Sequence, residues 1–213
     1  MRRILICGLV CVLVLLTACG KGGDTDDHSH EHTHPSTTTG TTNSGTAESS
    51  DVIRFNQPQN VTHVGGALAD PTTVSEETFA ADYDIRWAGM FDGAAYQTEY
   101  TLYHYTEDAT ASMGLSGLCY GLIRVTKEDQ VVMTMWVSTS GYAGSVAYPD
   151  ADNVFSQIRG QKVYLVDASK TKTPSMYAQF QWGKNYVTCV LYDCQQQDVV
   201  KFVRSVLANT PRK

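Results

Sequence analysis

Alternating apolar and polar residues dominate the second half of the chain and predict a series of β-strands. The segments concerned are rich in aromatic and β-branched residues, which suit a pleated and half-buried surface. A polar stretch at 126–129 separates two of them, as expected for a hairpin, and a tight turn at 183–185 separates the last two. We therefore expect an antiparallel sheet built from the segments 95–105, 118–125, 130–137, 162–167, 175–182 and 186–192.

Two segments have helical patterns instead. Ser75 is a typical N-cap followed by two acidic residues, so we expect a short helix that ends near Tyr83. A longer helix is expected after this sheet, opened by a capping box of Asp193 with Gln196. A sheet with this amphipathic helix packed on one face gives an α+β fold. The apolar stripe of the last helix consists of Val199, Val200, Phe202, Val203, Val206 and Leu207.

The composition of the chain changes sharply near Asp51. Residues 19–50 contain almost no apolar side chains, so they cannot bury enough surface to offset the entropy lost on ordering. We expect this stretch, which is rich in His, Thr and Ser, to be a disordered, flexible tether. Residues 51–213 have the composition and the size of a single globular domain.

The start of the chain has the pattern of an export signal. Two arginines precede an uncharged apolar run, 4–16, which is shorter than the ~20 residues that a membrane-spanning helix needs. The sequence Leu16-Thr17-Ala18-Cys19 follows and resembles the lipobox of bacterial lipoproteins. The resemblance implies a signal peptide over residues 1–18, cleavage before Cys19 and lipidation of the Cys19 thiol.

A lipidated Cys19 would hold the chain at the extracytoplasmic face of the cell membrane. The lipobox modification supplies at least two acyl chains, which is enough for durable anchoring. Gly20 follows the cysteine where an aspartate would mark inner-membrane retention, so the outer membrane is a second location if the host is Gram-negative.

The charge of the chain limits its partners. Removing residues 1–18 takes away two arginines and no acidic residue, so the formal charge changes from −6 to −8. An acidic chain without a basic run is a poor candidate for binding nucleic acid or anionic lipid surfaces. We therefore expect attachment to the membrane through lipid alone, no nucleic-acid partner, and an envelope protein or a small molecule as the ligand.

Three cysteines remain after cleavage and lipidation, namely Cys119, Cys189 and Cys194. Two arrangements are open: unpaired thiols that act as small core residues, or one disulfide with a leftover thiol. If a bridge forms, Cys119–Cys189 is the expected pair, because both residues lie in strand-like segments. Cys194 lies just before or within the first turn of the last helix, where the helix dipole would favour a thiolate.

The tether contains a metal-binding pattern. His28, His30, His32 and His34 alternate with other residues, so that four of the six histidines fall within seven residues. Neutral imidazole is a good ligand for Zn, and a flexible backbone can fold several rings around one ion. The tract is similar to the His-rich loops of envelope metal-uptake proteins. The alternatives are a soluble spacer and a tether whose charge changes near neutral pH.

The segment from Lys162 to Leu207 carries a second resemblance. It contains a strand, a strand that ends in Trp182, a glycine turn, another strand and an amphipathic helix that ends in Arg204-Ser205-Val206-Leu207. This order is similar to an uncharacterised extracytoplasmic domain of Gram-positive lipoproteins and anti-sigma-type membrane proteins. The resemblance implies an envelope-facing sheet-plus-helix domain and brings no catalytic residues with it.

The sequence lacks the motifs of common enzymes. The stretch Ser169-Lys170-Thr171-Lys172 has the Ser-x-x-Lys spacing of penicillin-binding enzymes, but Pro174 disfavours the helix that this motif needs, so we expect a loop. Nucleophile-elbow, phosphate-loop and dinucleotide-binding motifs do not occur. The spacing of Asp82, Asp84 and Asp92 matches no calcium loop. We therefore expect no enzymatic activity and no required cofactor, with Zn as the one ion that the sequence favours.

Tyrosines of segment 95–105 form the remaining candidate site. Tyr96, Tyr100 and His104 lie on one side of the expected strand, and a tyrosine-lined face binds glycan or peptide by stacking. The alternative is a half-buried sheet surface. The leading hypothesis is thus a membrane-anchored envelope lipoprotein with a non-enzymatic binding domain, and the alternative is Zn binding or delivery through the tether.

Overall fold

The computed structural model describes residues 51–58, 60–64, 68–148 and 154–212. The expected signal peptide, the tether, Cys19 and the four histidines of the tether lie outside the described residues. The strands are β1 (Phe55–Asn56), β2 (Asn60–Val64), β3 (Ala69–Val74), β4 (Tyr96–Tyr105), β5 (Leu118–Lys127), β6 (Gln130–Ser138), β7 (Gly144–Tyr148), β8 (Ser156–Ile158), β9 (Gln161–Asp167), β10 (Ser175–Trp182) and β11 (Asn185–Tyr192). The helices are α1 (Glu76–Asp82), α2 (Glu107–Met113) and α3 (Gln196–Asn209).

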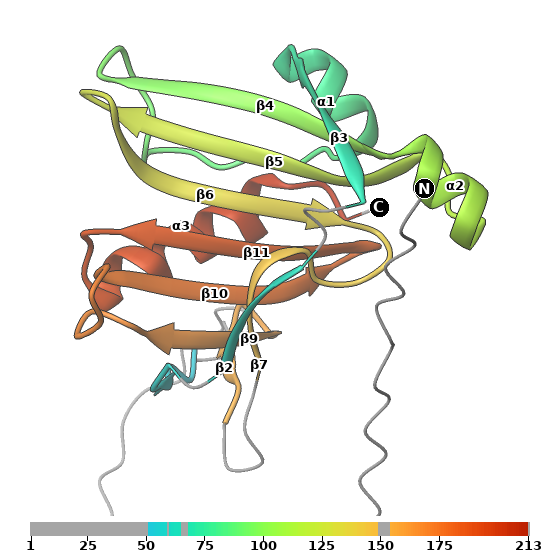
Figure 1. Ribbon diagram of the computed structural model, residues 1–213. Coiled ribbons are helices and arrows are strands. Elements are labelled where there is room, and N and C mark those ends of the chain that lie inside the picture. The colour runs from blue at the N-terminus through green and yellow to red at the C-terminus, as the bar shows by residue number, and fades with distance from the viewer. Residues whose placement is uncertain (1–50, 59, 65–67, 149–153, 213) are drawn as a thin grey trace, which may run out of the picture. The chain divides into compact units, whose positions relative to one another are not determined.

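One large sheet forms the framework (Figure 1). Its strands lie in the order β1-β9-β10-β11-β6-β5-β4-β3, and β8 pairs with the part of β9 that β1 leaves free. Every pairing in this sheet is antiparallel except that of β1 with β9. Strands β2 and β7 form a separate two-stranded ribbon, and β7 contacts β10 and β11. The fold is α+β, as the sequence predicts.

The hairpins agree with the sequence analysis. The turn between β5 and β6 places Glu128 and Asp129 at φ 50° and 63°, the left-handed conformation that two-residue hairpin turns require. Gly183 and Lys184 connect β10 to β11, and Asn185 already pairs with Trp182. The pattern did not predict β1, β2, β3, β7, β8 or α2, which are short or lie in stretches without clear periodicity.

Helix α1 begins where the sequence predicts, whereas helix α3 begins later than predicted. The Ser75 hydroxyl accepts the Thr78 amide at 3.2 Å and caps α1, as expected. Helix α3, however, begins at Gln196, and its capping contact is the Asp198 carboxylate accepting the Gln195 amide at 3.0 Å. The expected capping box of Asp193 with Gln196 is therefore wrong. The Asp193 amide still donates to the Pro174 carbonyl at 3.4 Å, so the chain has not yet left the sheet there.

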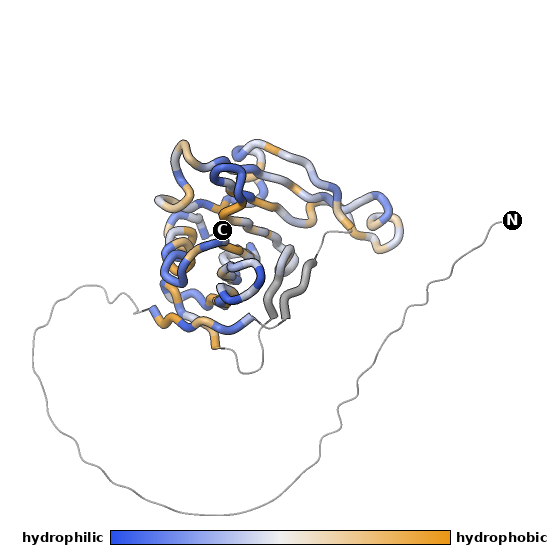
Figure 2. The backbone as a smooth tube through the Cα atoms, turned by 60° about the vertical axis from the view of Figure 1, so that its left-hand side comes forward, coloured by the Kyte–Doolittle hydropathy of each residue, from blue (hydrophilic) through white to orange (hydrophobic). Residues whose placement is uncertain are grey.

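Helices α1 and α3 cover one face of the large sheet. Helix α1 contacts β4 and helix α3 contacts β10, and both contribute to one continuous hydrophobic core. Hydrophobic and hydrophilic positions alternate along much of the backbone (Figure 2), which is how a sheet presents one apolar face to such helices. The opposite face is more polar, and there the Gln179 amide donates to the Thr188 hydroxyl at 3.3 Å. Among the described residues, no helix has the length and apolarity needed to cross a bilayer.

Candidate binding cleft

A cleft opens on the helix-covered face, between α1, strand β4 and the irregular segment 84–93. It consists of two adjoining cavities of ≈ 540 Å³ and ≈ 430 Å³. The two cavities have four lining residues in common, so we treat them as one cleft and call it the α1 cleft. The shared residues are Glu76, Ile85, Arg86 and Tyr100.

Aromatic rings form the floor of the α1 cleft. Phe79 of α1 is 1% exposed, and its ring lies 5.6 Å from that of Tyr83 and 5.3 Å from that of Tyr100. Gly121 of β5 makes this packing possible, because a Cβ atom there would lie 2.6 Å from Phe79 and 2.7 Å from Tyr83. The absence of a side chain at this position lets α1 lie directly on the sheet.

Two hydroxyl groups of the α3 end hold the outer wall of the cleft in place. The Thr210 hydroxyl accepts the Arg86 amide at 2.9 Å and donates to the Arg86 carbonyl at 3.0 Å. The Ser205 hydroxyl does the same with Ala88, at 2.7 Å and 2.8 Å. Each hydroxyl thus satisfies both polar groups of one extended residue, which no strand pairs with otherwise. Segment 86–88 is thereby attached to α3 without regular secondary structure.

Aromatic contacts reinforce this wall. Phe202 of α3 is fully buried, and its ring lies 5.8 Å from that of Trp87 and 5.5 Å from that of Phe91. Phe91 also meets Tyr96 of β4 edge to face, with 5.8 Å between the ring centroids. The Trp87 indole N–H is buried and has no hydrogen-bond partner among the described residues. Packing, rather than polar contact, therefore holds Trp87 in the wall.

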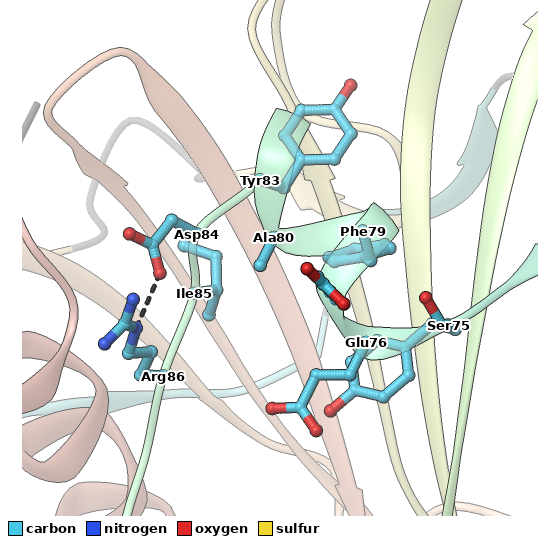
Figure 3. Close-up of a pocket in the computed structure, with 10 residues that line it drawn as sticks. Ser75, Glu76, Phe79, Ala80, Tyr83, Asp84, Ile85 and Arg86 are labelled. Atoms are coloured by element: carbon cyan, nitrogen blue, oxygen red, sulfur yellow. Dashed lines mark hydrogen bonds and ion pairs between the residues drawn. The ribbon is translucent and has the colours of Figure 1, made fainter.

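Charged side chains are distributed around the opening. Figure 3 shows Asp84 and Arg86 on one side of the larger cavity and Glu76 on the other. The Arg86 Nε donates to the Asp84 Oδ1 at 2.6 Å. Asp92, in the smaller cavity, accepts the Gly89 amide at 2.6 Å. The lining residues contain four carboxylates and one guanidinium, because Glu77 adds to the three acids already named.

Tyr100 remains a neutral hydrogen-bonding group in this cleft. Burial, followed by the nearby charge of Glu76, raises the pKa of Tyr100 to about 12. Burial also raises the pKa of Tyr83. Both hydroxyls consequently keep their protons at neutral pH and are able to donate as well as accept.

The structure keeps two of the three residues that the sequence grouped together. Tyr96 and Tyr100 both line the α1 cleft, whereas His104 does not. On the same strand, Tyr103 stacks on Tyr120, with 4.4 Å between the ring centroids. Ser169 of the Ser-x-x-Lys stretch lies in a turn, as expected, where it donates to Asp167 at 2.6 Å.

All three cysteines of the domain are free thiols. Cys119 lies on β5 and Cys189 on β11, and β6 runs between these strands. Two strand spacings of about 4.8 Å exceed the Cα separation of about 7 Å that a disulfide tolerates. The conditional pairing Cys119–Cys189 is therefore wrong, and the alternative of unpaired thiols agrees with the structure.

The expected activation of Cys194 is also wrong. Burial raises the pKa of Cys194 to about 12, and the charges of Asp198, Asp193 and Asp167 act in the same direction. The thiol lies before the N-cap of α3 and contacts the Leu191 carbonyl at 3.7 Å. Burial, reinforced by the surrounding carboxylates, therefore keeps Cys194 a protonated, partly buried thiol.

Sequence reasoning missed segment 84–93 as part of a site. This segment has neither helical nor strand periodicity, and its place in the cleft depends on hydroxyl groups more than a hundred residues away. Its one visible signal is the presence of Trp87 and Phe91 in a stretch without regular structure. Asp84 and Asp92 line the cleft, but among the described residues no group of three His, Cys, Asp or Glu side chains is placed to hold a metal ion.

Comparison with protein-family models, with curated proteins and with solved structures finds no match for this chain.

Proposed function

We propose that the chain is a lipid-anchored extracytoplasmic binding protein that holds a small ligand in the α1 cleft. The observation that carries the proposal is the cleft itself, which combines an aromatic floor with charged groups at its rim. Ligand sites in proteins have this composition of apolar walls and a few placed polar groups.

The anchor in this proposal rests on the resemblance of Leu16-Thr17-Ala18-Cys19 to a lipobox. The test is metabolic labelling of the full chain with an alkyne fatty acid in a bacterial host, followed by membrane fractionation. We expect label and membrane attachment in the wild type and neither in Cys19→Ala. Cys119→Ala is the matched control, and it should keep both. Equal labelling of Cys19→Ala and the wild type would exclude the anchor.

The cleft is tested separately from the anchor, on the unlipidated chain from Gly20 to Lys213. A library of small soluble compounds is screened by amide NMR, and hits are retained when they shift residues of the α1 cleft. Ala80→Trp places a large side chain in the cleft and should abolish these shifts. Ala111→Trp is the matched control, because Ala111 occupies the same position in α2 but is exposed. The proposal fails if no compound shifts cleft residues, or if hits bind the Ala80→Trp chain as they bind the wild type.

A second candidate function is Zn binding by the tether, favoured by the four histidines within seven residues. Calorimetric titration with Zn compares the chain from Gly20, the same chain with His28, His30, His32 and His34 changed to Ala, and a chain starting at Asp51. Metal handling predicts tight binding in the first chain alone. Weak or absent binding in all three would reduce the tract to a spacer.

A further inference from the structure

We propose that the α1 cleft selects organic cations, meaning amines or quaternary ammonium compounds. This inference rests on the proposed function of the cleft and specifies the class of its ligand. Three properties of the cleft support it: the excess of negative charge, the spread of that charge around the walls, and an aromatic ring beside it.

The excess of negative charge is local to the cleft. Glu76, Glu77, Asp84 and Asp92 line the two cavities, and Arg86 is the one basic residue among the lining side chains. Arg86 is moreover engaged with Asp84 at 2.6 Å, which leaves Glu76, Glu77 and Asp92 without an ion-pair partner among the described residues. A cleft lined by charge of one sign concentrates ligands of the opposite sign.

The placement of the acids favours an organic cation over a metal ion. A divalent metal needs several carboxylate oxygens converging on one point at short distance. Here the carboxylates lie on different walls, and among the described residues no three acidic, His or Cys side chains come together in the way a metal requires. An organic cation is larger and spreads its charge over several atoms. It can therefore contact carboxylates on different walls of the cleft, which a small metal ion cannot do.

The aromatic ring of Tyr100 supplies the third property. A cation is attracted to the face of an aromatic ring, and ammonium ligands are commonly recognised in this way. Tyr96 already has a cation nearby, since the Lys127 ammonium lies 6.0 Å from its ring centroid. Tyr100 has no such neighbour in the described part of the chain and lies close to Glu76, so that a ring and a carboxylate act on the same ligand.

The test uses the chain from Gly20 to Lys213 and a panel of organic cations: choline, tetramethylammonium and spermidine. The neutral control is 3,3-dimethylbutan-1-ol, which has the shape of choline without its charge. Dissociation constants come from amide NMR titrations at constant ionic strength. We expect choline to shift residues of the α1 cleft and to bind at least about ten-fold more tightly than the neutral analogue.

Two substitutions locate the effect. Glu76→Gln should weaken choline binding about five-fold, the size of one exposed charge contact. Glu107→Gln is its matched control, because Glu107 follows the N-cap Thr106 of α2 as Glu76 follows Ser75 of α1, and it should change nothing. Tyr100→Leu keeps an apolar side chain but removes the ring, and it should weaken choline more than the neutral analogue.

Several outcomes would overturn the inference. Equal binding of choline and its neutral analogue would do so, as would equal effects of the two glutamate substitutions. If neutral or anionic compounds from the library occupy the cleft while no cation of the panel does, the binding function stands and the cation selectivity falls. If no compound of any kind shifts cleft residues, both fall together.

Discussion

At the scale of single residues, the same hydrogen-bond arrangement occurs at three places where an irregular segment meets the framework of sheet and helices. One hydroxyl accepts the amide and donates to the carbonyl of one extended residue. Thr210 does this with Arg86, Ser205 with Ala88, and Ser156 with Arg54 at 2.9 Å in both directions. The bonds of Thr210 and Ser156 are partly buried and those of Ser205 are exposed. Because backbone groups shielded from water are costly without partners, the first two hydroxyls take the place of a neighbouring strand.

Thr210→Val removes the hydroxyl while keeping the shape of the side chain. Thr210 is 4% exposed, so the Arg86 amide and carbonyl would lose their partner in a partly buried site. We expect a loss of about 1–3 kcal/mol in the free energy of unfolding, measured by urea denaturation. Amide exchange at Arg86 should become faster. Thr110→Val, on the exposed face of α2, is the control and should lower the free energy of unfolding by less than about 0.5 kcal/mol. Equal losses of unfolding free energy in the two variants would contradict this role of Thr210.

The cysteines give a second prediction at this scale. With the pKa of Cys194 raised to about 12 by burial and neighbouring carboxylates, only about one thiol in ten thousand is ionised at pH 8. Burial raises the pKa of Cys189 to about 12 as well. We expect iodoacetamide to leave both unmodified in the folded chain, as read by peptide mass spectrometry, and to modify both in urea. Rapid alkylation of Cys194 in the folded chain would contradict the raised pKa and support the thiolate that the sequence led us to expect.

At the scale of elements, the position of α1 depends on the absence of a side chain at Gly121. Gly121→Ala would place its Cβ 2.6 Å from Phe79 and 2.7 Å from Tyr83, so the helix must shift. We expect a loss of about 1–3 kcal/mol in unfolding free energy and a displaced cleft floor, seen as amide shifts throughout α1. Gly160→Ala is the control: it has open space and only the cost of its positive φ, about 1 kcal/mol, and α1 should not respond. An unchanged α1 in Gly121→Ala would refute the contact.

The periodicity of apolar residues predicts the secondary-structure elements of this chain but not how those elements pack against one another. The strands with clear alternation, the hairpin at Glu128 and Asp129, and the N-cap Ser75 could all be derived from local pattern. The start of α3 could not, because an Asp193 amide that still bonds to Pro174 delays the helix. The cleft could not either, since its outer wall is fixed by contacts with α3 across more than a hundred residues. The site therefore depends on non-local contacts that leave no periodic trace.

At the scale of the whole molecule, two carboxylates connect distant parts of the chain to α3. Asp51, at the start of the described chain, accepts Arg204 at 2.7 Å and the Arg159 amide at 2.7 Å. Asp167, at the end of β9, accepts Gln196 at 2.7 Å and the Ser169 hydroxyl at 2.6 Å. Acidic groups thus hold helix α3 at its first residue and again in its second half, in addition to its apolar face.

These carboxylates predict how the molecule responds to acid. Hydrogen bonds from the Ser169 hydroxyl and amide, and from Gln196, lower the pKa of Asp167 below the ordinary value of an aspartate. For Asp51, burial alone would raise the pKa, but the Arg159 amide and the Arg204 guanidinium together lower it. A carboxyl whose pKa is lower in the folded than in the unfolded chain contributes stability above the unfolded value and loses it as pH falls through the folded value.

Asp167→Asn should therefore be less stable than the wild type at neutral pH, and this difference should shrink once the pH falls below about 4. Urea denaturation at about pH 7 and about pH 2.5 measures the two differences. Asp108→Asn changes an exposed acid in the first turn of α2 whose backbone carbonyl accepts the Ser112 hydroxyl, and this control should show little change at either pH. A difference for Asp167→Asn that stays the same in acid would mean that the charge of Asp167 does not contribute, and that its hydrogen bonds stabilise α3 equally well when the carboxyl is neutral.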